Sequence, residues 1–138
     1  MAVRRGELDP AGDQWPATIG HNSLVGSQRF ALSRLTLNEN QAQTWRPAVV
    51  RRAAKAMRRH GQPLDVVITP EGVVVLGDLL VLGARELGWT QINVRIESGR
   101  PLLELELMAT EFNKLAELSD WDDLKLGNLI LRVEAELP

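Results

Sequence analysis

Apolar and polar positions follow two different spacings along this chain, and together they predict an α/β fold. Compact apolar runs rich in β-branched residues predict buried strands at residues 66–69, 73–76 and 92–96. The turn Pro70-Glu71-Gly72 joins the first two runs as a hairpin. Weaker alternation predicts further strands over residues 30–37, with a bulge, and over residues 102–107. We therefore expect a small mixed sheet with surrounding helices.

Helical spacing occupies the stretches between these strands. Pro47 suits a first helical turn, and Gly61 suits the position after a C-terminus, which predicts a helix over 47–60. The cations that precede Gly61 complement the dipole at that end. A second helix is predicted over 78–88, because Gly77 ends the preceding strand and an apolar helical run follows it.

The last part of the chain is also predicted to be helical. Thr110 can cap a helix that runs through Leu118. Ser119, followed three residues later by Asp122, resembles a capping box that opens a final helix to about Leu137. This start places three acidic residues in a first helical turn: Asp120, Asp122 and Asp123. The helix dipole favours acids there, and this explains the cluster better than metal binding does.

Composition along the chain divides it into three parts. Residues 1–28 mix Gly, Pro, Asp, Asn and Ser without periodicity, which is typical of a mobile N-terminal arm. Residues 29–109 hold the predicted sheet and its helices. Residues 110–138 form a helical segment that we expect to pack on that domain. With 138 residues the chain is long enough for one core.

Composition also removes several classes of function. The chain has no cysteine, which excludes disulfides, thiol catalysis and zinc sites built from thiolates. His21 and His60 are its two histidines, and they do not supply the ligands of a histidine metal centre, so we expect no metal. No apolar run approaches the ~18 residues that cross a bilayer. The N-terminus lacks the layout of a signal peptide. We expect a cytoplasmic protein without a membrane partner.

The net charge of −2 conceals opposite charges in the two halves of the chain. Residues 1–60 carry 10 Lys/Arg against 4 Asp/Glu, whereas residues 61–138 carry 6 against 14. On a helical wheel, five cations of the predicted helix 47–60 share an arc of about 120°, and no acid lies among them. Together with the arginine before the helix they form a basic ridge, which consists of Arg46, Arg51, Arg52, Lys55, Arg58 and Arg59.

The basic ridge has more than one explanation. A row of cations without acids is suited to DNA phosphates, where each contact releases counterions and makes the affinity depend on salt. Alternatively, the ridge is a solvated face that pairs with the acidic C-terminal half of the chain, or it binds an acidic protein partner. A helix built only for solubility normally interleaves Glu with Lys, so we favour DNA as the partner.

Residues 60–96 have the sequence HGQPLDVVITPEGVVVLGDLLVLGARELGWTQINVRI. In this stretch a helix end at Gly-Gln-Pro is followed by a hairpin, then by a helix that begins after Gly77, and then by a strand. This order, with the strand, polar loop and basic helix before it, resembles the ParB/sulfiredoxin superfamily in the form of a ParB N-terminal domain. The chain downstream also resembles the segment that follows this domain in phage and plasmid relatives, at Asn113, Leu118, Trp121 and Asp122. The likeness covers roughly residues 29–123.

The resemblance implies a ligand pocket, which is placed in this chain at Asn38, Asn40, Gln41, Gly77, Asp78, Leu79 and Leu82. In nucleotide-binding ParB proteins, two arginines after the acidic residue bind phosphates, whereas Leu79 and Leu80 stand in their places here. Because Asp78 without basic companions repels phosphate, we expect no cofactor and regard nucleotide binding as doubtful. The activity of sulfiredoxins is excluded, because their catalytic group is a cysteine.

The pocket residues also have structural explanations. Asp78 suits the N-cap of the helix, and binding of a metal or polar ligand is the alternative. Leu79 and Leu82 either fill the former pocket or form a patch for a partner. The loop at residues 38–41 is either a plain turn or a weak contact to phosphates and base edges.

These features predict a DNA-associated, ParB-like accessory protein of plasmid, phage or other mobile-element type. It would bind the nucleic-acid backbone through the basic ridge without nucleotide-dependent catalysis. The alternative is a protein-interaction or inhibitor module that uses the apolar former pocket and the acidic C-terminal half. A metal-dependent nuclease or nucleotide hydrolase comes third, because Asp78 is its one catalytic candidate.

Overall fold

The computed structural model describes residues 27–40 and 43–137. The predicted N-terminal arm, apart from its last two residues, therefore lies outside the described residues, and so does Gln41. Within the described residues, no helix is long and apolar enough to cross a membrane.

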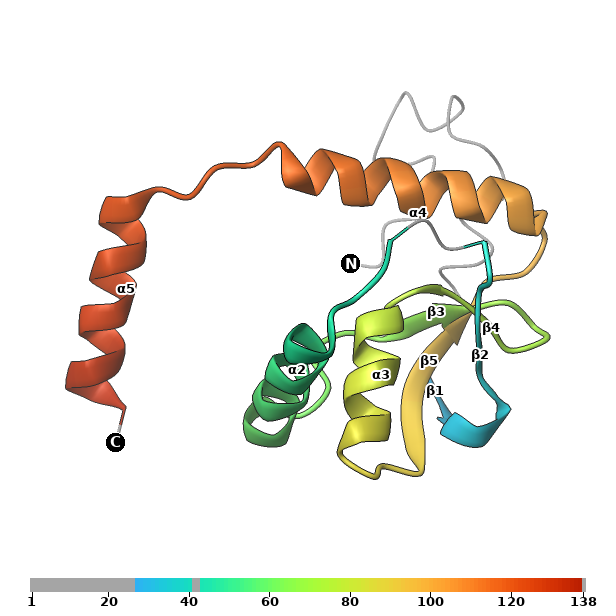
Figure 1. Cartoon of the computed structure of the whole chain (residues 1–138), viewed down its shortest axis with the longest axis horizontal. Coiled ribbons are helices and arrows are strands. Elements are labelled where there is room, and N and C mark those ends of the chain that lie inside the picture. Colours follow the sequence, from blue (N-terminus) through green and yellow to red (C-terminus); the bar gives the residue numbers. More distant parts are fainter. Residues whose placement is uncertain (1–26, 41–42, 138) are drawn as a thin grey trace, which may run out of the picture.

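A five-stranded mixed sheet forms the centre of the fold (Figure 1). Its strands follow the order β1-β5-β3-β4-β2. They are β1 (Gln28–Ala31), β2 (Thr36–Leu37), β3 (Val66–Ile68), β4 (Val73–Leu76) and β5 (Gln91–Ile96). Two of the neighbouring pairs are antiparallel, β1 with β5 and β3 with β4, and the other two are parallel. The sheet confirms the predicted α/β class and the predicted hairpin.

The described residues form four α-helices: α2 (Pro47–His60), α3 (Asp78–Glu86), α4 (Leu102–Glu117) and α5 (Asp123–Glu136). The first three lie against the sheet, whereas α5 lies away from it (Figure 1). Helices α2 and α3 lie side by side on one face, whereas α4 runs along the other side and extends beyond the sheet (Figure 1). The predicted helix 47–60 is confirmed at both ends, with Pro47 in its first turn and the backbone N–H of Gly61 bonded to the Met57 carbonyl.

The sheet separates two hydrophobic cores, because successive side chains of a strand point to opposite faces. Along β3, Val66 and Ile68 belong to the larger core, which also contains side chains of α2 and α3. Val67 between them belongs to the smaller core, where it meets Leu105 and Ala109 of α4. All three residues of β3 are buried, as the continuous apolar run predicts.

The expected single strand over residues 30–37 is wrong. The segment is instead divided into β1, a 3-10 turn (η2, Leu32–Arg34) and β2, which lie on opposite edges of the sheet. The turn buries both Leu32 and Leu35 to 5% exposure. The break in alternation that suggested a bulge therefore marks the turn that carries the chain from one edge to the other.

The expected strand at residues 102–107 is also wrong, because these residues begin helix α4. Pro101 precedes the first turn, and Leu105 and Ala109, four positions apart, pack against the sheet. Thr110 is consequently an exposed residue inside a helix and caps nothing. The dense leucines of this segment fit either spacing, and contact with the smaller core selects the helix.

The final helix is confirmed, with a different cap. The side chain of Asp122 accepts a hydrogen bond from the backbone N–H of Lys125 at 3.0 Å, whereas the Ser119 hydroxyl donates to the Ala116 carbonyl at the end of α4. Asp123 lies in the first turn, and Asp120 precedes the helix. In the described part of the chain α5 buries no residue, so the packing expected of residues 110–138 is not seen for this helix. The domain boundaries themselves stay a prediction.

Candidate functional site

The basic ridge lies on the outer face of α2. All of its members are exposed: Arg46, Arg51, Arg52, Lys55, Arg58 and Arg59. The opposite face of the helix buries Ala54 and Met57 against the core. Helix α3 approaches there closely at Gly83, where an added Cβ would lie 2.8 Å from the Met57 sulfur. This contact holds α2 with its cations toward solvent.

No carboxylate among the described residues forms an ion pair with a cation of the basic ridge. Two ion pairs occur among them, Glu97 with Arg100 and Lys114 with Glu117, and neither involves α2. The explanation in which the ridge pairs with the chain's own acidic half therefore finds no contact within residues 27–40 and 43–137. An array of like charges that remains solvated in this way generates a positive potential over the helix.

A cavity of about 260 Å³ lies beside the start of α3. Its lining combines the end of β2, the segment before α2, β4 and the first turns of α3: Leu37, Asn38, Gln43, Thr44, Trp45, Val74, Asp78 and Leu82. This cavity lies where the resemblance places a ligand pocket. Leu82 is one of the residues that line it.

The junction between β4 and α3 has a tight backbone. Gly77 adopts a left-handed conformation (φ 98°) and is itself the N-cap, so the expectation that Asp78 caps the helix is wrong. A Cβ at Gly77 would lie 3.2 Å from the Val66 side chain, which adds a steric reason for glycine. Asp78 is the first helical residue, and its carboxylate accepts a hydrogen bond from the indole N–H of Trp45.

The other predicted pocket residues divide between the cavity and its surroundings. Leu79, Asn40 and Gly77 are not among the lining residues. Leu80 packs against the larger core. Asn38, Asp78 and Leu82 do line the cavity, together with Trp45, which the sequence analysis did not include and which bonds to Asp78.

Helix α4 holds the polar loop beside the cavity. The side-chain amides of Asn38 and Asn40 both donate to the carboxylate of Glu106, at 3.0 and 3.4 Å. Asn113, seven residues farther along α4, donates to the Gln43 side chain at 3.1 Å. The described part of the loop, Asn38 to Asn40, is thus bonded to α4. The sequence pattern concealed this contact, because Glu106 and Asn113 share a helix face only if residues 102–117 form one helix.

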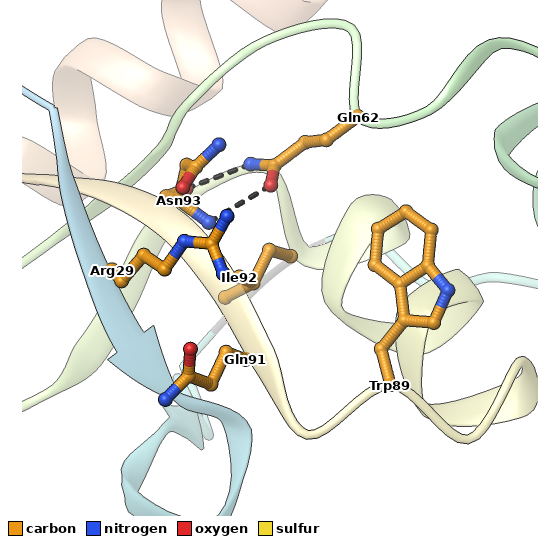
Figure 2. Close-up of a pocket in the computed structure, with 6 residues that line it drawn as sticks. All are labelled: Arg29, Gln62, Trp89, Gln91, Ile92 and Asn93. Carbon is orange, nitrogen blue, oxygen red and sulfur yellow. Dashed lines mark hydrogen bonds between the residues drawn. The ribbon is translucent and has the colours of Figure 1, made fainter.

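A second cavity, of about 250 Å³, lies at β1 and β5, toward the opposite edge of the sheet, and was not predicted. Figure 2 shows its lining: Arg29, Gln62, Trp89, Gln91, Ile92 and Asn93. The Gln62 amide donates to the Asn93 carbonyl at 2.7 Å and accepts from the Asn93 N–H at 2.8 Å (Figure 2). One side chain thereby replaces a strand partner for β5 just before β3 begins. Arg29 adds an exposed cation to the lining.

Metal ligands do not gather in the described residues, where no three His, Cys, Asp or Glu side chains come together in a group that could hold a metal ion.

Two ParB proteins are among the solved structures with a similar fold. The C-terminally truncated chromosome-partitioning protein ParB from Caulobacter crescentus, complexed with CTP-γ-S, is similar with a TM-score of 0.69 and 16% identity. The match covers 78% of this chain and 62% of that chain. A Pnob8-like ParB-N domain is similar with a TM-score of 0.56 and 12% identity, over 69% of this chain and 40% of that one. No protein-family model and no curated protein matches the sequence.

The chain therefore has the ParB/sulfiredoxin-like fold that the order of its elements predicts. Sulfiredoxin from Arabidopsis thaliana is also similar, with a TM-score of 0.47 and 13% identity over 54% of this chain and 86% of that one. The chain spans about 62% of the length of the first ParB structure and about 40% of the second.

The described lining of the cavity beside α3 carries a single charge. Asp78 is the one charged side chain among the described residues that line it, and none of these residues is Lys or Arg. Arg46, which follows Trp45 in the chain, is exposed and is not a lining residue. A triphosphate carries several negative charges that need cations or backbone N–H groups around them. A carboxylate at the first position of α3 opposes such a ligand.

Proposed function

We propose that this protein is a DNA-associated, ParB-like accessory protein of mobile-element type. In this proposal the basic ridge of α2 contacts the phosphate backbone, and the protein acts without nucleotide-dependent catalysis. Backbone contacts position a protein on DNA without reading bases, so we expect little sequence preference.

One observation carries the proposal: α2 presents its cations on one exposed face, and no carboxylate among the described residues pairs with them. The sequence from residue 46 to residue 60 contains no acid, so the potential is not cancelled within the helix either. The chain as a whole has a net charge of −2, which means that the positive region is local and would orient the protein on a polyanion.

The test is binding of the full chain to a fluorescent duplex, followed by anisotropy at increasing salt. With about four phosphate contacts, the affinity should fall roughly 10²-fold between about 50 and about 200 mM salt. A triple reversal, Arg51→Glu, Lys55→Glu and Arg58→Glu, should abolish binding and leave the circular dichroism spectrum unchanged, because these side chains are exposed.

The matched control reverses three exposed cations elsewhere, Lys114→Glu, Lys125→Glu and Arg132→Glu. It changes the net charge by the same amount and should bind DNA only slightly less well than the wild type. Absence of DNA binding by the wild type, or an equal loss in both triple variants, would contradict the proposal.

A protein-interaction module is the second candidate, and the exposed apolar side chains of α4 and α5 favour it. Among them are Phe112 (63% exposed), Leu118 (77%), Ile130 (50%) and Val133 (43%). Trp121 between the two helices is 80% exposed. A partner bound through these apolar side chains should be lost on Phe112→Asp and should still bind the triple ridge variant.

A further inference from the structure

The cavity beside α3 has apolar walls and one charge. Leu37, Val74 and Leu82 contribute aliphatic surface, and Trp45 contributes an aromatic ring. The polar lining residues other than Asp78 are uncharged: Asn38, Gln43 and Thr44. A pocket of this kind selects a ligand by apolar contact along its length and by one polar group at a defined point.

Asp78 is placed to receive a donor. Trp45 donates its indole N–H to one carboxylate oxygen, Oδ2, and no hydrogen bond to Oδ1 occurs within the described residues. An ionised carboxylate can only accept hydrogen bonds, so a ligand at Oδ1 must be a donor. Since the side chain of Asp78 is partly buried, solvent screens its charge incompletely.

The positive N-terminus of α3 does not reverse the preference of Asp78 for a ligand that donates hydrogen bonds. The dipole of α3 places roughly half a positive charge at its first turn. Asp78, the first residue of that turn, carries a full negative charge. The sum is negative, so a phosphate is repelled and a cation is attracted there.

We infer that this cavity binds an aliphatic cation, an ammonium or guanidinium group on an apolar stem, with the charged group at Asp78 and the stem along Leu82 and Val74. Long cationic side chains bury their methylene groups on apolar surface in this way, and an aromatic ring beside the cation adds a further attraction. The volume of about 260 Å³ suits such a ligand and lies below the ~300–1,000 Å³ of pockets for larger molecules.

The inference goes beyond the proposed contact with DNA and involves a different surface. Two sources can supply the chemistry: a free alkylamine or alkylguanidine, or a Lys or Arg side chain of a partner protein.

The experiment uses the full chain with ¹⁵N-labelled tryptophan, whose indole N–H signals are observed by NMR. The chain has 4 Trp residues, and Trp45→Phe assigns the signal of interest. Butylguanidinium should shift the Trp45 signal in a saturable manner. Butanesulfonate, which carries the opposite charge on the same stem, and Mg–CTP should leave it in place.

Two substitutions test the role of the charge. Asp78→Asn keeps an acceptor for Trp45 and removes the carboxylate, and it should weaken butylguanidinium binding about tenfold or more. Glu71→Gln, at an exposed carboxylate of the β3–β4 turn, should change nothing. Leu82→Arg places a cation in the lining and should exclude butylguanidinium and admit butanesulfonate.

Several results would overturn the inference. These are a saturable Trp45 shift with Mg–CTP in the wild type, no response to butylguanidinium, or equal affinities in the wild type and Asp78→Asn. A peptide with one arginine that binds at least about tenfold tighter than butylguanidinium would identify a protein side chain as the source, and equal affinities a free small molecule. The triple ridge variant should bind butylguanidinium normally, and Asp78→Asn should bind DNA normally, so failure of one proposal is distinguishable from failure of the other.

Discussion

The basic ridge of α2 and the cavity beside α3 lie on neighbouring helices but differ in charge and in construction. The ridge consists of exposed cations on successive turns of one helix. The cavity is assembled from four separate segments, and its one charge is the carboxylate of Asp78. The two sites therefore carry opposite charges, exposed cations on α2 and one carboxylate in a largely apolar cavity.

The two sites depend on the fold to different degrees. The ridge needs only that α2 forms and packs by its apolar face. The cavity also needs α4, because Glu106 and Asn113 hold the loop that supplies part of its lining. Perturbations of packing should therefore affect the two sites unequally, which makes the comparison testable.

Weakening the contact between α4 and the sheet should have the largest effect on stability. Leu105 is fully buried in the smaller core, and Leu105→Ala should lower the free energy of unfolding by about 2–5 kcal/mol. Well below the melting temperature, the variant should respond less to butylguanidinium and bind DNA as the wild type does. Leu115→Ala, on the same helix but 57% exposed, is the control and should stay within about 0.5 kcal/mol of the wild type. Weaker DNA binding by the folded Leu105→Ala protein would show that the ridge also depends on α4.

Disturbing the contact between α2 and α3 should give an intermediate effect. In Gly83→Ala the new methyl would meet the Met57 sulfur at 2.8 Å. Overpacking costs about 1–3 kcal/mol, and alanine returns about 1 kcal/mol in helix propensity, so we expect a net loss of up to about 2 kcal/mol in urea denaturation. Gly127→Ala in α5, with no atom within 4 Å, should cause no loss. Unchanged stability of Gly83→Ala would mean that the flexible Met57 side chain moves aside at little cost.

Removal of one cation should give the smallest effect. Lys55→Gln should leave the stability unchanged, because Lys55 is exposed, and should reduce the slope of log affinity against log salt by about 0.9. The measurement is duplex binding over a salt series. Lys125→Gln in α5 should keep the full slope. A slope that Lys55→Gln does not alter would remove this residue from the proposed DNA surface.

The helical period made the ridge predictable from the sequence. A stretch of fourteen residues from Pro47 to His60 has one apolar face and one cationic face, and the helix forms with those bounds. The hairpin was predictable for a similar reason, because its turn and its two strands are contiguous. In both cases the deciding interactions lie within a few turns or residues of chain.

The cavity was only partly predictable. The family resemblance pointed to Asn38, Asp78 and Leu82, which line it. It did not point to Trp45, which lies 33 residues before Asp78 and reaches it through the fold. Glu106 was hidden for another reason, since its segment was expected to be a strand.

Composition and local periodicity are enough to predict the mixed α/β class, the amphipathic α2 helix with its cations, and the absence of cysteine chemistry. Tertiary structure decided that residues 102–117 are a helix, that β1 and β2 occupy opposite edges of the sheet, and that Trp45 and Glu106 border one cavity. The leucines of α4 satisfy either period locally, so only the burial of Leu105 and Ala109 against Val67 and Val75 distinguishes the helix from a strand. The choice between helix and strand therefore depends on contacts between residues far apart in the chain, which a local sequence pattern does not show.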